Sequence, residues 1–550
     1  MTKFSATTPI YYVNAKPHLG HAYTTIVADA VSRWHRLLGD DVHLLTGTDE
    51  HGLKIQQAAD AAGVSPKEFA DSIAPLFAQA WERLNITHDD FIRTTEPRHA
   101  AGVKKLLQAC YDAGDIEVDV YRGQYCIPCE AYFVEEELIE GKCPIHMQPT
   151  TFVEEENYFF RLSRFEDRLL KWYEDHPNAI TPGFRMNEVI GFIKGGLNDF
   201  SVSRKTLTWG IPLPWDSSHV AYVWFDALAN YITAIGYGTD DKTFAENWPV
   251  DYHFIGKDIV YFHALFWPAM LEGANYRTPS GLFVNGFLTV NGQKMSKSRG
   301  TFIKAETYLE HLNPEYLRYY FASKLSDKVE DSDLNLDDFV QKVNSDLVGK
   351  VVNIASRCAK FINTKFDNKL SATCAEPELV QSFIDAGDSI AKAYEAREFS
   401  AAIREIMALA DKANQYIDEK KPWALAKIEG EEQQVHDVCS VGINLFRQLA
   451  VYLAPVLPTL AAQVQDFLKL DRFDFASAQT ALVDHEIALF QPLMQRVDPK
   501  AVAAMVDASK DSLAAAAEPV KVEKKKEKKA APAKVEAKVG EAEIIGIEDF

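Results

Sequence analysis

Residues 4–21, FSATTPIYYVNAKPHLGH, constrain the fold of this chain more than any other segment. The run from Ser5 to Tyr12 is rich in Thr, Ile and Tyr, which predicts a buried strand, and a turn at Pro17 follows it. From Leu19 to Leu38 apolar residues recur at helical spacing and predict an amphipathic helix. A strand, a turn and a helix in this order are typical of open α/β sheets.

The predicted junction between this strand and this helix has the chemistry of a phosphate site. His18 and His21 flank Gly20 at the expected start of the helix. Unpaired backbone N–H groups and the positive end of the helix dipole favour an anion there, and histidine rings add donors. The alternative is an ordinary helix start with two surface histidines, and the junction alone does not decide between them.

Alternation of strands and helices continues on both sides of an interruption. A second apolar strand is expected at Asp41–Thr48, with a helix at Leu53–Ala61 behind it. After the interruption, further strands are expected at Val220–Asp226, Asp251–Gly256 and Leu282–Val284. This order predicts the α/β class with a doubly wound parallel sheet of the Rossmann type.

The segment between the two halves of the predicted sheet and the C-terminal part of the chain have sequence patterns that differ from those of the sheet. Short aromatic strands, cysteines and acidic runs from Val118 to about Ser203 predict an inserted domain, and Asn291-Gly292 between extended runs predicts a tight hairpin. Helical periodicity from about Leu334 to Leu482 and on to Ala516 predicts a helix bundle. The expected boundaries are a first sheet half at 1–115, an insert at 116–219, a second half at 220–290, a linking region at 291–335, the bundle at 336–515, and a charged linker with the start of a further module at 516–550.

Size and charge limit the classes of protein to which the chain can belong. At 550 residues it exceeds one hydrophobic core, so several domains are expected. The formal net charge of −21 argues against binding nucleic acid through an overall positive field, although a local basic surface can still follow a phosphate backbone. The absence of a long apolar run and of a signal peptide in the sequence predicts a cytoplasmic protein without membrane contact.

A second cluster of phosphate-binding side chains follows the predicted hairpin. Lys294-Met295-Ser296-Lys297-Ser298 carries two ammonium groups and two hydroxyls on one loop. Such groups suit a polyphosphate whose charge grows during transfer, whereas the alternative is a solvated basic turn. Together with the histidines near residue 20, the cluster indicates a nucleotide site.

A cysteine cluster lies within the predicted insert. Cys126 and Cys129 form one knuckle, and Cys143 and His146 form a second one with the same spacing. Three thiolates and one imidazole complete a tetrahedral Zn²⁺ site with no open position, so we expect one structural zinc per chain. The alternative is three incidental cysteines and a surface histidine.

The two motifs His-Leu-Gly-His and Lys-Met-Ser-Lys-Ser together resemble the signatures of class I aminoacyl-tRNA synthetases. The segments TTPIYYVNAKPHLGH, TGTDEHG, YVWFDALANY, FIGKDIVYFHALFWP and FLTVNGQKMSKS narrow the resemblance to the methionyl-tRNA synthetase family, over residues 4 to about 510. The resemblance implies that L-methionine and ATP form methionyl-adenylate and pyrophosphate with Mg²⁺. It also implies transfer of the methionyl group to the 3′ end of tRNA with a CAU anticodon, for translation initiation and elongation.

The resemblance assigns roles to matching residues. The catalytic residues would be His18, His21, Lys294 and Lys297. ATP would be held by His18, Gly20, His21, Lys257, Asp258, Lys294, Met295, Ser296, Lys297 and Ser298, with Arg204 a further candidate. Methionine would contact Ile10, Tyr12, Asp49, Trp224, Ala227, Leu228, Tyr231, Ile259, His263 and Trp267, with Asp49 on its ammonium group. An aromatic-lined pocket suits a polarisable thioether, although such aromatic residues are also common in plain hydrophobic cores.

Three residues of the predicted bundle are candidates for reading the anticodon. Asn353 and Arg357 lie four apart on one flank of a helix, and Trp423 follows Lys420-Lys421-Pro422 between two helices. An amide, a guanidinium and an indole suit hydrogen bonding to unpaired bases and stacking on them, and the resemblance implies this role. Without it, the Asn/Arg pair would be a solvated helix face.

Other classes of protein remain alternatives at this stage. One is a class I synthetase for cysteine, leucine, isoleucine or valine, but the aliphatic enzymes should carry a longer insert. A nucleotidyltransferase would have no use for such a bundle, and a non-catalytic tRNA-binding protein would not need both intact motifs. The apolar residues 542–550 are expected to begin a further tRNA-binding module, through which a homodimer would form; the chain as given is expected to be a monomer.

Overall fold

A six-stranded parallel sheet confirms the predicted α/β class. In the computed structural model, which describes residues 2–127, 131–133, 135–144, 147–295, 301–325 and 331–517, all neighbouring strands of this sheet run parallel. Their order is β3 (Asp90–Arg93), β2 (Asp41–Asp49), β1 (Lys3–Tyr12), β11 (Tyr252–Gly256), β12 (Gly281–Asn285) and β7 (Ile180–Thr181). Parallel strands align their carboxyl ends at one edge, which is where ligands bind in such sheets.

Alternation along each strand divides the interior into two hydrophobic cores. Leu44, Phe254 and Phe283 pack on the side of α1 (Leu19–Leu38) in a core that continues into the helix bundle. The next residue in each case, Leu45, Ile255 or Val284, packs in a second core on the other face. Neighbouring residues of a strand point to opposite faces, so these central strands are apolar throughout. The remaining helices near the sheet are α2 (Leu53–Ala62), α3 (Pro66–Arg83), α4 (Pro97–Asp112), α9 (Asp241–Asn247) and α10 (Trp267–Gly273).

The prediction of a sheet strand at Val220–Asp226 is wrong. Only β10 (Val220–Ala221) is extended, and it pairs antiparallel with β9 (Ser203–Arg204) outside the main sheet. The chain then forms α7 (Val223–Leu228) and α8 (Asn230–Thr233). This segment is buried on nearly every side, so its apolar run has no periodicity that separates a strand from a helix.

The insert contains the expected aromatic strands, together with helices that were not predicted. Its four-stranded sheet has the order β5 (Ala131–Phe133), β4 (Ile116–Cys126), β6 (Thr151–Phe160) and β8 (Phe200–Ser201). Helices α5 (Glu166–Asp175) and α6 (Gly183–Lys194) follow, with 3₁₀ turns at Glu135–Glu137 and Leu162–Phe165. The short strand β7 also falls in this range yet joins the main sheet beside β12, so the range 116–219 supplies an edge strand.

The predicted hairpin at Asn291-Gly292 is confirmed. Strands β13 (Leu288–Val290) and β14 (Gln293–Lys294) pair antiparallel. Both turn residues have positive φ, 50° at Asn291 and 72° at Gly292, as a type I′ turn requires. The linking region then contains α11 (Ala305–His311), α12 (Pro314–Lys324) and β15 (Ser332–Leu334).

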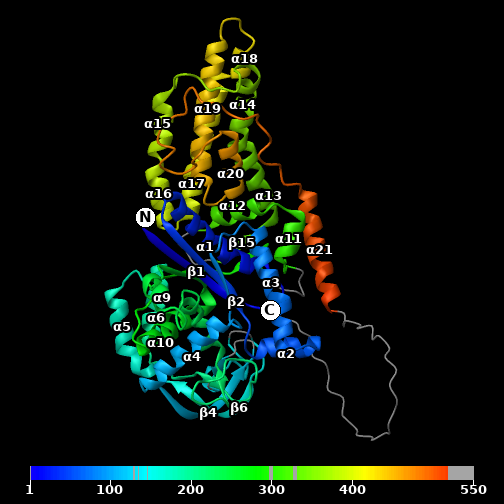
Figure 1. Cartoon of the computed structure of the whole chain (residues 1–550). Coiled ribbons are helices and arrows are strands. Elements are labelled where there is room, and N and C mark those ends of the chain that lie inside the picture. Colours follow the sequence, from blue (N-terminus) through cyan, green and yellow to red (C-terminus); the bar gives the residue numbers. More distant parts are fainter. Residues whose placement is uncertain are drawn as a thin grey trace.

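The C-terminal part is the predicted helix bundle, which lies at the opposite end of the molecule from the insert strands β4 and β6 (Figure 1). The bundle contains α13 (Leu336–Lys342), the π-helical stretch Val343–Val352, α14 (Asn353–Lys365), α15 (Pro377–Asp385), α16 (Gly387–Glu395), α17 (Phe399–Lys420), α18 (Pro422–Leu425), α19 (Glu432–Leu453) and α20 (Pro458–Phe467). The last described helix, α21 (Pro499–Ala517), lies outside the bundle and packs on α11 of the linking region (Figure 1). Among the described residues, no helix is long and apolar enough to cross a membrane.

The prediction of helix as far as Leu482 and on to Ala516 is wrong for residues 468–498, which form an irregular strap over the bundle. Three bundle asparagines pair with the strap backbone, each donating to a carbonyl and accepting from an N–H. The pairs are Asn344 with Val497, Asn363 with Ala488 and Phe490, and Asn444 with Leu482. These side chains satisfy backbone groups that a helix would satisfy internally.

Candidate active site

The first candidate residues cap α1 at the carboxyl edge of the sheet. His18 is the N-cap, and its Nδ1 accepts the Gly20 N–H at 3.1 Å. The His18 N–H in turn points to His21 Nδ1 at 3.5 Å, which completes a capping box made of two histidines. Because each Nδ1 accepts a backbone N–H, each ring carries its proton on Nε2.

The two imidazoles lie against each other, with ring centroids 3.6 Å apart. Burial, and to a smaller extent the neighbouring His18, lowers the pKa of His21 well below its ordinary value. His21 is therefore a neutral hydrogen-bond donor at physiological pH. Two Nε2–H groups at the positive end of a 20-residue helix form a site suited to a phosphate oxygen.

The linking region packs directly on this helix start. Met295 lies over Gly20, where an added Cβ would stand 2.7 Å from the Met295 Cε and 2.9 Å from the His18 Cε1. The Leu19 N–H donates to the Ile303 carbonyl at 3.0 Å, and the Ala305 N–H donates to the Pro17 carbonyl at 2.9 Å. The helix start is therefore joined to the lysine loop by the Met295 side chain, and to the segment that follows the loop by backbone hydrogen bonds.

Only part of the lysine loop can be located. Lys294 is exposed at the end of β14, whereas Ser296, Lys297 and Ser298 lie outside the described residues. Lys257, a further nucleotide candidate, pairs with Asp331 at 2.6 Å and lies over the Phe287 ring. Its neighbour Asp258 is exposed.

Two buried histidines organise the candidate methionine pocket. His263, within the π-helical turn Phe262–Phe266, donates from Nδ1 to the Ile259 carbonyl at 2.9 Å. Its Nε2 therefore accepts the Tyr231 hydroxyl at 2.8 Å. Burial lowers the pKa of His263 to about 4, so the ring is neutral.

The second histidine, His253, was not predicted from the sequence. The Trp267 indole N–H donates to its Nε2 at 3.2 Å, so its Nδ1–H donates to the Thr7 hydroxyl at 2.6 Å. The rings of His253 and Tyr231 are 4.1 Å apart, and burial lowers the pKa of His253 well below its ordinary value. The position of His253 inside β11 gave no functional signal in the sequence, because a histidine within an apolar strand has the same pattern as an ordinary core residue.

The other pocket candidates form two groups. Ile10, Leu228, Tyr231, Ile259 and Trp267 pack in the second core. Trp224 stacks on Phe262 with centroids 3.7 Å apart, and Ala227 is buried one turn later. Tyr12 packs on the first core with Lys54 over its ring, and it pairs in register with the buried Asp49 of β2.

A buried carboxylate that the sequence did not single out joins the two sides of this pocket. Asp226 accepts from His51 Nδ1 at 2.6 Å and from His99 Nε2 at 2.7 Å. Burial opposes ionisation of Asp226, but the two histidines outweigh it and hold its pKa at about 2. Asp226 directly precedes Ala227, and His51 lies two residues after Asp49. The sequence segment TGTDEHG drew attention to the region of His51, but no pattern near Asp226 identified that residue as its partner.

The bundle brings two of the three anticodon candidates together. The Arg357 guanidinium lies 4.6 Å from the centroid of the Trp423 ring, and it pairs with Asp418 of α17. Trp423 is 39% exposed, so part of the indole remains accessible to a ligand. Asn353 begins α14, one turn before Arg357.

The cysteine cluster is described only in part. Cys126 at the end of β4 and Cys143 in the loop after the Glu135–Glu137 turn are both fully buried. Cys129 and His146 lie outside the described residues, and within those residues no group of three or more metal-binding side chains occurs. Arg204 lies over the Tyr125 ring and 3.7 Å from Glu155, inside the insert rather than near the helix start.

Comparison with known proteins agrees with this geometry. Residues 4–151 and 134–359 match the family model of class I tRNA synthetases (M), and residues 370–517 match the anticodon binding domain of methionyl tRNA ligase. The chain is 44% identical to the methionine–tRNA ligase of Psychrobacter arcticus and 43% identical to that of Psychrobacter cryohalolentis. Each alignment covers 99% of this chain and 84% of the relative.

Solved structures give the same result. Mycobacterium tuberculosis methionyl-tRNA synthetase in complex with methionyl-adenylate superimposes with a TM-score of 0.86 at 36% identity, over 90% of this chain and all of the other. The apo form of the same enzyme gives 0.79 at 32% identity, over 91% and 99%. With both motifs joined at one helix start and both family models matched, the chain belongs to the methionyl-tRNA synthetase family of the class I tRNA synthetases.

Proposed function

We infer that the chain is a methionine–tRNA ligase, and we propose which of its residues carry each step. It activates L-methionine with ATP, releases pyrophosphate, and transfers the methionyl group to tRNA. The observation that carries this proposal is the contact between the two motifs, with Met295 over Gly20 and the segment after the lysine loop paired with the start of α1.

Methionine occupies the pocket of Tyr231, His263 and Trp267. The polarity of this pocket supports the proposal, because both of its histidines are neutral and hydrogen-bonded within the protein. No charged group is then needed beside the thioether, which packs on aromatic rings. Asp49, at the carboxyl end of β2, binds the substrate ammonium group.

The first step requires no general base. The methionine carboxylate is already ionised at neutral pH, and it attacks the α-phosphorus in line with the departing pyrophosphate. The Nε2–H groups of His18 and His21 donate to phosphate oxygens as negative charge develops, and Gly20 leaves room for the nucleotide. Lys294 and Lys297 neutralise the pyrophosphate; Lys257, Asp258 and the hydroxyls of Ser296 and Ser298 complete the nucleotide contacts. Mg²⁺ bound with ATP supplies further charge neutralisation on the phosphates.

The second substrate is tRNA with a CAU anticodon. Arg357 and Trp423 offer a guanidinium and a partly exposed indole at the tip of the bundle, and this pair suits stacking of an unpaired base. Asn353 contributes an amide one turn away. The 2′-hydroxyl of the terminal ribose then attacks the methionyl carbonyl of the adenylate at the carboxyl edge of the sheet. The ester bond to tRNA forms as the bond to phosphate breaks, and AMP and a proton are released.

A zinc ion would be held by Cys126, Cys129, Cys143 and His146. The two described members are compatible with such a site, because both thiols are fully buried within the insert. A Cys₃His donor set closes the coordination shell, so the ion would organise the insert and take no part in the reaction. Its removal should therefore lower the stability of the insert rather than change adenylate chemistry directly.

ATP–pyrophosphate exchange measured with each of the twenty amino acids tests this function. Exchange with methionine is expected, and it should not require tRNA. Exchange that is absent with methionine and present with another amino acid would refute the assignment. Charging of tRNA bearing a CAU anticodon then tests the second step.

A further inference from the structure

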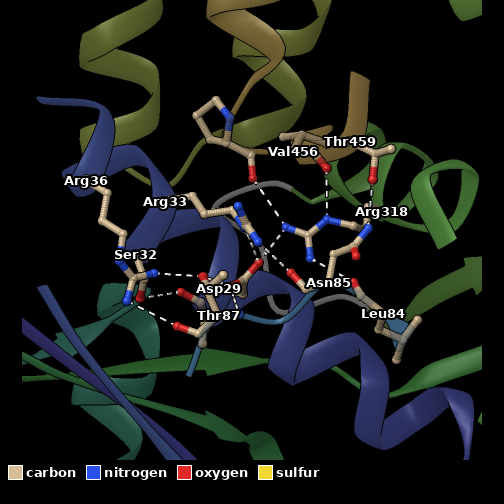
Figure 2. A network of polar contacts seen from close by, with 12 residues as sticks. Asp29, Ser32, Arg33, Arg36, Leu84, Asn85, Thr87, Arg318, Val456 and Thr459 are labelled. Atoms are coloured by element: carbon tan, nitrogen blue, oxygen red, sulfur yellow. Dashed lines mark hydrogen bonds and ion pairs between the residues drawn. The ribbon is translucent and has the colours of Figure 1, made fainter. Parts of the chain in front are cut away.

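A buried ion pair connects three parts of the chain at the base of the bundle (Figure 2). Asp29 of α1 and Arg318 of α12 are both fully buried, and their charged groups are 2.6 Å apart. The pair lies far from every residue assigned a role in the reaction above. Removing one partner of a buried ion pair is strongly destabilising, whereas well-packed hydrophobic residues in the same place often give equal or greater stability. The presence of this ion pair therefore requires a reason other than stability.

Each partner is fully occupied by contacts to a different part of the molecule. Arg318 donates from Nε to the Val456 carbonyl at 2.9 Å and from Nη2 to the Pro455 carbonyl at 3.3 Å, both in the turn between α19 and α20. Asp29 accepts from Arg33 at 2.8 Å and from the backbone and hydroxyl of Thr87, each at 2.7 Å. The pair thus fastens α1 to the bundle through α12.

Asp29 is ionised at neutral pH. Burial opposes its ionisation, but Arg318 and Arg33 outweigh this effect and hold its pKa at about 2. The contact is therefore a charge-assisted hydrogen bond with fixed geometry, which limits the rotation of α1 about its axis.

One end of this connection is the candidate active site. The same helix that carries Asp29 begins at His18, eleven residues earlier, which is about 16 Å along the helix axis. A helix is stiff over this length, so fixing Asp29 also fixes the position and rotation of His18 and His21 relative to the bundle.

The other end is the bundle tip. Helices α17 and α19, with 22 residues each, run about 33 Å between the junction and the tip. Asp418 near the end of α17 pairs with Arg357. Glu395, the last residue of α16, lies just before α17 begins, and it accepts the Trp34 indole N–H of α1 at 2.7 Å. Helix α17 thus runs from the contact with α1 to the candidate anticodon residues.

We propose that Asp29 and Arg318 are positioning residues that hold α1 in register with the bundle, so that a tRNA bound at the tip presents its 3′ end at His18 and His21. The proposal rests on the proposed function above. A loosened junction would leave both sites intact and misalign them, which reduces the fraction of bound tRNA in a reactive geometry.

The test compares three reactions of the same variants. We would measure pyrophosphate exchange, charging of full-length tRNA, and charging of an acceptor-stem hairpin that lacks the anticodon arm. For Arg318→Gln, exchange and hairpin charging should stay within about twofold of the parent, whereas kcat for full-length tRNA falls about tenfold with little change in KM. Arg318→Lys, which keeps the charge, should recover part of the loss. Arg472→Gln, an exposed arginine paired with Asp474, is the matched control and should change none of the three.

Several outcomes would overturn the proposal. A parallel fall in all three reactions means that the pair serves stability alone, and an unchanged ratio of full-length to hairpin charging means that it does not align the sites. If Arg318→Gln fails to fold, the exposed Glu395→Ala tests the same junction, and it should lower that ratio severalfold; an unchanged ratio there also refutes the proposal. If the parent protein does not catalyse exchange with methionine, the proposed function fails instead.

Discussion

Replacing Asp226 by asparagine should weaken methionine binding far more than ATP binding. Asp226 is fully buried between His51 and His99, and through His51 it joins the loop that follows Asp49 to the helix that carries Ala227. Asparagine has nearly the same shape, but its NH₂ group would face one of the two histidine N–H donors. One charge-assisted hydrogen bond is lost and a buried donor is left without an acceptor.

The magnitude follows from the pKa of the carboxyl group. An ordinary aspartate has a pKa near 3.9 and Asp226 has a pKa of about 2, a difference that corresponds to roughly 2–3 kcal/mol of stability at neutral pH. This stability is present above pH 4 and is lost as the pH falls towards 2. Breaking a buried ion pair usually costs ~3–5 kcal/mol. The magnitude derived from the pKa and the magnitude typical of ion pairs therefore agree at about 3 kcal/mol.

The assay is pyrophosphate exchange with methionine or ATP varied in turn. If the whole effect reached the pocket, about 3 kcal/mol would raise the KM for methionine ~100-fold, which is an upper bound because part of the loss lowers stability instead. We expect a rise of at least ~10-fold for methionine, with the KM for ATP within about twofold.

Asp216→Asn is the matched control for this variant. Asp216 also has a pKa of about 2, and it too contacts a histidine, but its own carboxylate is partly exposed beside the exposed Ser218 and the buried His219. Solvent screens this carboxylate and the turn carries no candidate substrate residue, so both KM values should stay unchanged. Equal effects of the two variants, or a parallel rise in both KM values for Asp226→Asn, would refute the idea that burial of Asp226 aligns the pocket.

Three other predictions concern separate parts of the chain. Trp423→Ala should leave exchange unchanged and reduce tRNA charging at least ~10-fold, because the lost stacking face is worth ~1–3 kcal/mol; loss of both activities would indicate a structural role. Cys129→Ser should reduce bound zinc, measured by metal analysis, to background, whereas Cys374→Ser, outside the cluster, should not. The pKa of His263 is about 4 in the folded protein and near 6.5 when unfolded, so only the unfolded chain takes up this proton between these values. Stability should therefore fall as the pH drops through this window, by up to ~3 kcal/mol, and His263→Gln should flatten this part of the thermal-unfolding profile; an unchanged slope would contradict a buried neutral imidazole.

Local patterns predicted much of the fold because their causes are local. Helix α1 occupies the predicted range Leu19–Leu38, where apolar periodicity and a capping residue agree. The hairpin formed at Asn291-Gly292 because both residues tolerate positive φ. Predictions failed where tertiary contacts override local preference. Residues 220–226 are buried on nearly every side and became mostly helical, and the strap 468–498 is held by side chains of helices distant in the sequence.

The sequence by itself indicated which side chains are candidates for the site of this protein, and the tertiary structure decided which partners they meet. The motif histidines, the lysine loop and the pocket aromatics were all identifiable from spacing and family resemblance. Contacts such as Lys16 with Glu306, 290 positions apart, and Asp226 between two histidines have no local signature. The same is true of the Asp29–Arg318 pair. Such partners come together only when the sheet, the insert and the bundle pack, because burial turns a scattered set of charges into a few obligatory pairs.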